Sequence, residues 1–283
     1  MFFMATFFGL NDCLFAGKNK KKVGYVAVTD SGVGGLAVLK KLKNIFCDLN
    51  FLYVSDCACV PYGNKSKSQI ISLCKKNVKT ALSNGAVAIV VACNTMSRAG
   101  KVAFFSCGAP CFFVEPDYEI LNAADKNYKN CAVFCTELTA ADNMLKKLKN
   151  DLKCSVLPQK DLASQIESRL SARYFKNDGK KQKNDYNIDF SGLKADFCAE
   201  NVKTVFLSCT HYIHIKRVFE EKFKNAKIYD GTEKLKSEIS AFLKRTENST
   251  PEKSLRGGKI KFVGNGKIKM KRAFFAMCAE NAD

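Results

Sequence analysis

Short apolar runs alternate along this chain with longer stretches of mixed polarity. Each run is rich in Val, Ile, Leu or Phe and is too short to span a membrane, which predicts a buried strand. Strands are predicted at residues 23–29, 51–56, 87–92, 112–116, 131–136, 155–158, 204–208, 227–231 and 259–265. Helices are predicted to start near residues 36 and 213, to span 66–84, 140–149 and 161–167, and to follow the last strand. This alternation predicts an α/β fold with mainly parallel sheets.

Two of these strands end in a cysteine followed by hydrogen-bonding side chains. The run at 87–92 leads into Cys93-Asn94-Thr95, and the run at 204–208 leads into Cys209-Thr210-His211. Ligands of open α/β sheets bind at the carboxyl ends of the strands. A single free cysteine is more often a small buried hydrophobe than a reactive group, and this chain has 14 cysteines. Because the pattern occurs twice, it predicts two thiols that face one small polar substrate.

A glycine-rich turn, Asp30-Ser31-Gly32-Val33-Gly34-Gly35, lies between the first strand and the helix that follows it. Strand, glycine turn and helix is also the outline of a nucleotide site, but neither of the usual phosphate-binding glycine spacings is present. Asp30 can accept a hydrogen bond from an ammonium or a thiol, and Ser31 can donate one to a carboxylate. The turn therefore favours a ligand with an amino group and a carboxylate. The alternative is that Asp30 or Ser31 is simply a helix N-cap.

Two further loops bring polar groups to strand ends. Pro61-Tyr62-Gly63 predicts a rigid backbone that presents N–H and C=O groups. Thr136 and Thr139 follow the strand predicted at 131–136.

The composition is that of a globular protein in a reducing compartment. The chain has 283 residues, enough for two domains, and 47% of them are hydrophobic. The cysteines include no C-x-x-C pair, which argues against a disulfide framework and for the cytoplasm. Residues 1–17 are apolar, but Asn11 and Asp12 interrupt them and the positive charge comes after them, which is not the order of a secretory signal. We expect residues 1–22 to form an N-terminal extension.

The formal net charge of +19 raises nucleic acid or an anionic membrane as a partner. Almost all of the basic excess is lysine spread along the whole chain, whereas arginine is favoured for bidentate recognition of phosphates and bases. We interpret the charge as a solvated lysine surface that weakly attracts an anionic substrate. Neither a nucleic-acid partner nor a membrane partner is predicted, and a homodimer is among the assemblies that the sequence allows.

Four motifs together resemble glutamate racemase, within the wider aspartate/glutamate racemase superfamily. They are D-S-G-V-G-G-L at 30–36, P-Y-G at 61–63 with Lys65-Ser66 after it, A-C-N-T at 92–95 and C-T-H-Y at 209–212. Their order and approximate spacing match the family from about Val23 to the C-terminal strand. The chain departs from the family pattern at Thr29, Met96, Arg98, Ser208 and Ile213-His214-Ile215.

The resemblance implies a racemase that needs no cofactor and no metal, and that makes D-glutamate for peptidoglycan in the cytoplasm. It implies two similar α/β domains with the active site at their interface. The first domain would comprise residues 23–116 and 229–283, and the second residues 117–228.

The resemblance also implies roles for individual residues. Cys93 would act on D-glutamate with the help of Asp30, and Cys209 would act on L-glutamate with the help of His211 and Glu167. Two thiols suit this chemistry, since inversion by proton transfer needs one base on each face of Cα, and each thiol must be activated by a neighbour. The substrate-binding positions implied by the family are Asp30, Ser31, Tyr62, Gly63, Asn94, Thr95, Thr136, Thr139, Thr210 and His211.

Three other functions compete with this one. The first is racemisation of aspartate or another amino acid. The second is a metal site formed by Cys209, His211 and His214, for which the sequence offers no clear fourth ligand. The third is a binding protein that kept the fold and lost catalysis, against which the intact pair of thiols argues.

Overall fold

The computed structural model describes residues 24–116, 130–150, 154–175, 187–189, 202–246 and 257–279. The predicted N-terminal extension and the lysine-rich stretch at 176–186 lie outside the described residues.

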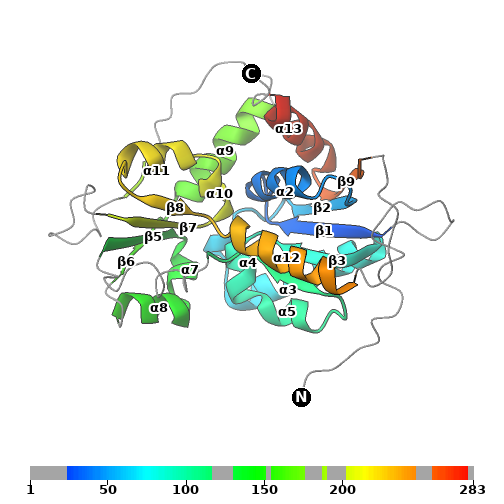
Figure 1. Cartoon of the computed structure of the whole chain (residues 1–283), viewed down its shortest axis with the longest axis horizontal. Coiled ribbons are helices and arrows are strands. Elements are labelled where there is room, and N and C mark those ends of the chain that lie inside the picture. The colour runs from blue at the N-terminus through cyan, green and yellow to red at the C-terminus, as the bar shows by residue number, and fades with distance from the viewer. Residues whose placement is uncertain are drawn as a thin grey trace.

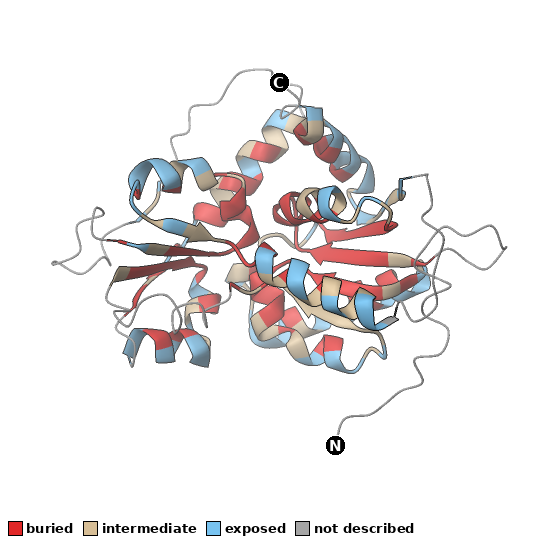
Figure 2. Ribbon diagram, viewed as in Figure 1, coloured by how far each residue is buried: buried red, intermediate tan, exposed pale blue. Residues whose placement is uncertain are grey.

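Five parallel strands form the first sheet, in the order β4-β3-β1-β2-β9. They are β1 (Tyr25–Asp30), β2 (Phe51–Asp56), β3 (Ala86–Val91), β4 (Cys111–Phe113) and β9 (Ile260–Asn265). The central strands consist almost entirely of buried residues, as Figure 2 shows, because helices cover both faces of the sheet.

Four parallel strands form the second sheet, in the order β6-β5-β7-β8. They are β5 (Cys131–Cys135), β6 (Ser155–Pro158), β7 (Thr204–Ser208) and β8 (Lys227–Tyr229). The two sheets lie side by side, the second on the left in Figure 1. The prediction of an α/β fold with parallel sheets is confirmed.

Helices connect the strands and cover the sheets. They are α2 (Gly34–Ile45), α3 (Lys67–Ser83), α4 (Asn94–Ala99), α5 (Lys101–Phe105), α7 (Glu137–Ala140), α8 (Asn143–Asn150), α9 (Leu162–Phe175), α10 (Thr210–Ile213), α11 (Lys216–Lys222), α12 (Thr232–Thr246) and α13 (Lys267–Ala279), with a short 3₁₀ helix, η1, at Tyr62–Asn64. None of these described helices has both the length and the apolar character that a membrane crossing requires.

The elements of the second sheet meet those of the first in two zones. In one zone, α9 and α10 pack against α13 and α2, respectively. In the other, α7 contacts α4 and η1. The helix predicted to start near residue 213 is α11, which begins at Lys216, and a short helix that was not predicted, α10, precedes it and ends at Ile213. The residues between them, His214 and Ile215, form the break.

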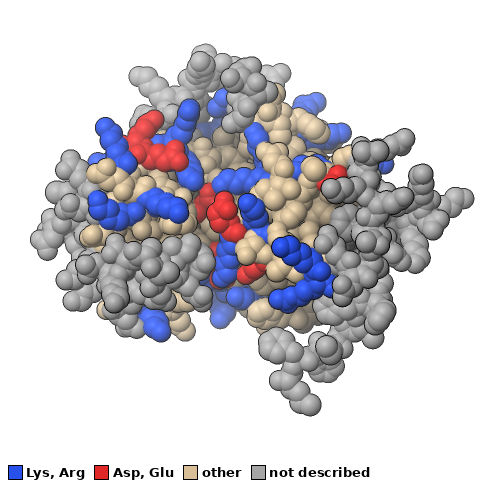
Figure 3. Space-filling view, viewed as in Figure 1, with Lys and Arg blue, Asp and Glu red and all other residues tan. Residues whose placement is uncertain are grey.

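Basic and acidic side chains are interleaved on the face shown in Figure 3, where lysine and arginine lie over both halves of the molecule and an acidic group lies near the centre. This distribution on the described part of the face fits a solvated charged surface.

Candidate active site

Asp30 ends β1 and is fully buried where the two halves of the molecule meet. Its Oδ1 accepts a hydrogen bond from the N–H of Gly32 at 2.9 Å, and its Oδ2 accepts one from Thr210 Oγ1 at 3.0 Å. Burial raises the pKa of the Asp30 carboxyl above its ordinary value, although the charge of His211 opposes the shift. One bond to its own turn and one to α10 therefore fix this carboxylate between the halves.

The turn after Asp30 is packed so closely that it needs glycine. A Cβ added at Gly32 would lie 2.5 Å from an oxygen of Glu167, and one added at Gly34 would lie 2.6 Å from Thr210 Oγ1. The buried hydroxyl of Tyr53 donates to the Gly32 carbonyl at 2.6 Å. Tyr53 was missed in the sequence, although a tyrosine in a strand of otherwise apolar, buried character is a signal for such a contact.

Cys93 follows β3 and is the N-cap residue of α4. Its side chain is 7% exposed, and its Sγ lies 4.0 Å from the hydroxyl of Ser31. Burial, and then the nearby charge of Asp30, raise the pKa of this thiol well above its ordinary value. A hydrogen bond from the N–H of Met96 favours the thiolate and works in the opposite direction.

Cys209 occupies the equivalent place in the second sheet, following β7 as the N-cap residue of α10. It is also 7% exposed, and its Sγ lies 3.8 Å from Nδ1 of His211. The other ring nitrogen of His211, Nε2, donates to Oε2 of Glu167 at 2.7 Å. Cys209, His211 and Glu167 thus form a continuous buried chain of hydrogen bonds.

His211 and Glu167 are an ion pair. Burial alone would lower the pKa of His211, but its hydrogen bonds to Cys209 and Glu167 outweigh burial and hold that pKa well above its ordinary value. Burial likewise opposes ionisation of Glu167, and its hydrogen bond to His211 outweighs burial, so that the pKa of Glu167 is lowered. At neutral pH this arrangement places an imidazolium beside the sulfur of Cys209.

Glu167 lies on α9 and also accepts a hydrogen bond from the N–H of Val33 at 2.9 Å. The resemblance implies its role through the match of L-A-S-Q-I-E at 162–167 to a hydrophobic stretch of the family that ends in Glu. The structure brings it into contact with both His211 and the glycine-rich turn.

The predicted binding threonines form a second group across the interface. Thr95 Oγ1 lies 3.3 Å from Thr136 Oγ1, which lies 2.9 Å from Thr139 Oγ1. Gly63 packs on Thr136, since a Cβ added at Gly63 would lie 3.2 Å from the Thr136 Cβ. The hydroxyl of Tyr62, by contrast, donates to Asp56 at 3.4 Å.

Asn94 is buried at the start of α4. Its Nδ2 donates to the Val114 carbonyl at 3.1 Å, whereas its Oδ1 is buried without a hydrogen-bond partner in the described structure. This oxygen is available to accept a hydrogen bond from a ligand.

The two thiols belong to the same site. Ser31 approaches Cys93, the adjacent Asp30 is bonded to Thr210, and Thr210 follows Cys209 directly. A charge on Cys209 also acts to raise the pKa of Cys93. Two thiols, one from each sheet, therefore meet around one buried carboxylate.

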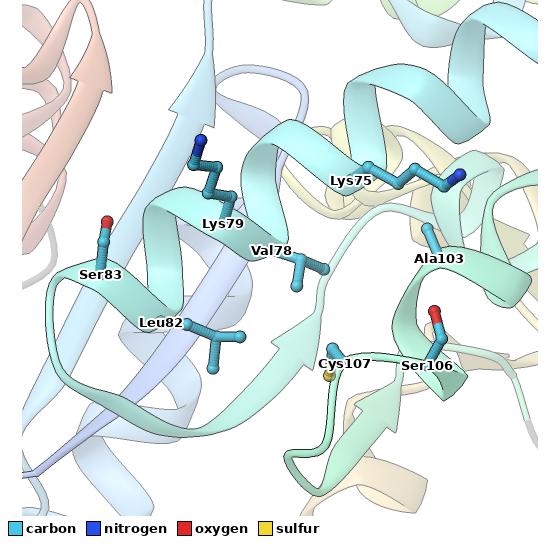
Figure 4. A pocket seen from close by; sticks show the side chains of 8 residues that line it. All are labelled: Lys75, Val78, Lys79, Leu82, Ser83, Ala103, Ser106 and Cys107. Carbon is cyan, nitrogen blue, oxygen red and sulfur yellow. The ribbon is translucent and has the colours of Figure 1, made fainter.

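No group of three or more His, Cys, Asp and Glu side chains is arranged to hold a metal ion within the described ranges. A separate groove of about 520 Å³ lies between α3 and α5 (Figure 4). Lys75, Val78, Lys79, Leu82, Ser83, Ala103, Ser106 and Cys107 line this groove, and none of them is a predicted site residue.

Several glutamate racemases are similar to this chain in sequence or in fold. No protein-family model matches the chain. The glutamate racemase of Campylobacter concisus is 31% identical over 217 residues, which cover 74% of this chain and 78% of that protein. A glutamate racemase isoform of Bacillus anthracis has a similar fold, with a TM-score of 0.69, 23% identity, and coverage of 92% of this chain and 94% of that one.

A glutamate racemase of Francisella tularensis, solved in complex with D-glutamate, has a TM-score of 0.61 at 21% identity and covers 89% of this chain and 94% of its own. These structures share the fold. The relative from Campylobacter concisus is similar enough in sequence, over enough of both chains, to show that this chain belongs to the glutamate racemase family.

Proposed function

We propose that this protein interconverts L- and D-glutamate, with one thiol removing the proton from Cα and the other supplying a proton to the opposite face. The observation that carries the proposal is the placement of Cys93 and Cys209 at equivalent strand ends of two different sheets, around Asp30. Inversion by proton transfer requires a base on each side of a planar carbanion. Thiols held by two separate sheets can approach one carbon from two directions.

In the D-to-L direction, the thiolate of Cys93 takes the Cα proton of D-glutamate and becomes a thiol. The carbanion then takes a proton from the thiol of Cys209 on its other face, which leaves L-glutamate and a Cys209 thiolate. The L-to-D direction runs the same steps backwards. No net proton is gained or lost, and no group is oxidised or reduced.

The surroundings of each sulfur differ in a way that fits these steps. The imidazolium of His211 stabilises a thiolate on Cys209, and Glu167 keeps that imidazole charged. The N–H of Met96 stabilises a thiolate on Cys93, and the charge of Asp30 disfavours it. A substrate ammonium placed beside Asp30 would offset that charge and make the Cys93 thiolate easier to form.

The remaining polar groups can orient the two carboxylates of glutamate. Hydroxyl groups donate to carboxylates, and five predicted positions supply hydroxyl or backbone donors. These positions are Ser31, Gly63, Thr95, Thr136 and Thr139, whereas Oδ1 of Asn94, which has no partner in the described structure, can accept from the substrate ammonium. The Francisella tularensis racemase of the same fold binds D-glutamate, which supports glutamate as the ligand here.

Family membership also supports a biological role. We propose that the protein works in the cytoplasm, without a bound cofactor, and that its D-glutamate enters peptidoglycan. The many free thiols of the described residues suit a reducing compartment.

Purified protein is expected to racemise both L- and D-glutamate without added pyridoxal phosphate and after treatment with a chelator. Chiral chromatography of reactions started from each enantiomer of glutamate, aspartate and alanine measures this directly. Faster turnover of aspartate than of glutamate would identify aspartate as the preferred substrate and contradict the choice of glutamate. The absence of turnover of any of these amino acids would contradict the proposed racemase activity.

A further inference from the structure

His214 lies in the break between α10 and α11, next to the chain of hydrogen bonds at Cys209 but outside it. Its side chain is part-buried, and its Nε2 lies 3.0 Å from the carbonyl oxygen of Val33, 181 residues away in the sequence. A carbonyl can only accept, so Nε2 must carry the proton in this contact.

Val33 is held through both of its backbone polar groups. Its carbonyl accepts from the N–H of Leu36 at 3.0 Å and from His214, and its N–H donates to Glu167 at 2.9 Å. The two side-chain partners, His214 and Glu167, come from the half of the molecule that carries Cys209. Val33 belongs to the turn that carries Ser31, which approaches Cys93. The two contacts therefore fix the turn beside Cys93 relative to the elements beside Cys209.

Burial and the neighbouring cation keep His214 neutral. Burial, and then the cation on His211, lower the pKa of His214 to about 4, while its hydrogen bonds to the backbone of Val33 and Gly34 and the charge of Glu167 act in the opposite direction. Asp30, on β1, reaches this region through its hydrogen bond to Thr210. Because a neutral His214 does not compete for the carboxylate, Glu167 pairs with His211, and these two side chains make the 2.7 Å contact.

We propose that His214 is a positioning residue, whose Nε2–H holds the Val33 carbonyl so that the Val33 N–H stays on Glu167 and Glu167 stays on His211. In the proposed reaction, on which this inference rests, the effect reaches the chemistry through the charge on His211 beside Cys209. The N–H and the carbonyl of Val33 belong to consecutive peptide groups that share its Cα, so losing the contact at the carbonyl is expected to loosen the contact at the N–H.

Nuclear magnetic resonance of the imidazole nitrogens tests this without any activity assay, because the chain contains only two histidines. In wild-type protein labelled with ¹⁵N-histidine, His214 is expected to show the neutral Nε2–H form, and His211 the doubly protonated form at neutral pH. A signal of the Nδ1–H form or of a cation for His214 at neutral pH would overturn the proposal. This measurement needs no variant, so it stands even if substitutions at His214 fail to fold.

Two variants separate positioning from packing. His214→Gln keeps a side-chain N–H donor and is expected to leave the titration of His211 unchanged. His214→Leu removes the donor, and the titration midpoint of His211 is expected to fall by about one pH unit because Glu167 is held less firmly against it. Equal midpoints in the Gln and Leu variants would overturn the proposal.

The pH profile of kcat/KM for L-glutamate gives a kinetic test of the same effect. Its basic limb is expected to have a lower apparent pKa in His214→Leu than in wild type, and an unchanged apparent pKa in His214→Gln. If the protein proves not to racemise glutamate, the nitrogen spectra still test the contact itself. Failure of the proposed function and failure of this inference are therefore distinguishable.

Discussion

Cys93→Ala and Cys209→Ala are each expected to reduce net racemisation of glutamate by on the order of 10³-fold or more, because a positioned general acid or base contributes roughly 10² to 10⁴ and each direction needs both groups. Each thiol is nearly buried at the end of a strand and has its own neighbours, Ser31 and the N–H of Met96 for Cys93 and His211 for Cys209. Neither sulfur can replace the other, since they belong to different sheets. Turnover is measured from both enantiomers by polarimetry or circular dichroism.

Cys107→Ala is the matched control, since Cys107 is a free and partly exposed thiol in the groove between α3 and α5. It is expected to retain wild-type turnover. Circular dichroism in the far ultraviolet shows whether each variant is folded. Wild-type turnover in folded Cys93→Ala or folded Cys209→Ala would remove that thiol from the mechanism.

Asp30→Asn is expected to lower kcat/KM for both enantiomers by about 10²-fold. The variant loses the charge-assisted contact between the carboxylate and the substrate ammonium, and a buried contact of this kind is worth roughly 3 kcal/mol. The carboxylate is fully buried and held by Gly32 and Thr210, in the place where we put the substrate ammonium. Asparagine has nearly the same shape, so the loss would come from the charge.

Asp30→Asn is also expected to shift the pH dependence of kcat/KM in one direction. The Asp30 charge raises the pKa of Cys93, so its removal is expected to lower that pKa in the free enzyme. Proton abstraction from D-glutamate needs the Cys93 thiolate, and the acid limb of kcat/KM for D-glutamate should therefore move to lower pH. Rate profiles of wild type and variant measure the shift.

Asp230→Asn is a suitable control for this shift. Asp230 is also a buried carboxylate that follows a strand, and it pairs with Lys41 at 2.6 Å, outside the candidate site. This control is expected to leave the acid limb in place. An unchanged limb in Asp30→Asn, or the same shift in both variants, would contradict the assigned role of Asp30.

The strands and the two thiols could be predicted from the sequence because their signals are local. A buried parallel strand is a continuous apolar run, and the cysteine that follows it is visible in the same few residues. The break at His214-Ile215 was less visible, since helix boundaries depend on tertiary packing as well as on local pattern. For this reason the helix start predicted near residue 213 falls before the observed start at Lys216, and α10 was not predicted.

The contacts that join the two halves could not be predicted from the residues alone. Glu167 and Val33 are 134 residues apart, and neither has a local pattern that indicates the other. Such contacts depend on how two sheets are placed relative to each other, which periodicity does not report. The predicted division into domains 23–116 plus 229–283 and 117–228 stays a prediction.

The central claim is that two different groups remove and supply the proton at Cα. It is tested most directly by incubating L-glutamate with the wild-type protein in deuterated water and stopping the reaction at low conversion. The account predicts D-glutamate that carries deuterium at Cα, together with remaining L-glutamate that still carries protium. D-glutamate that keeps the original Cα proton would mean that a single base serves both faces, and would contradict the account.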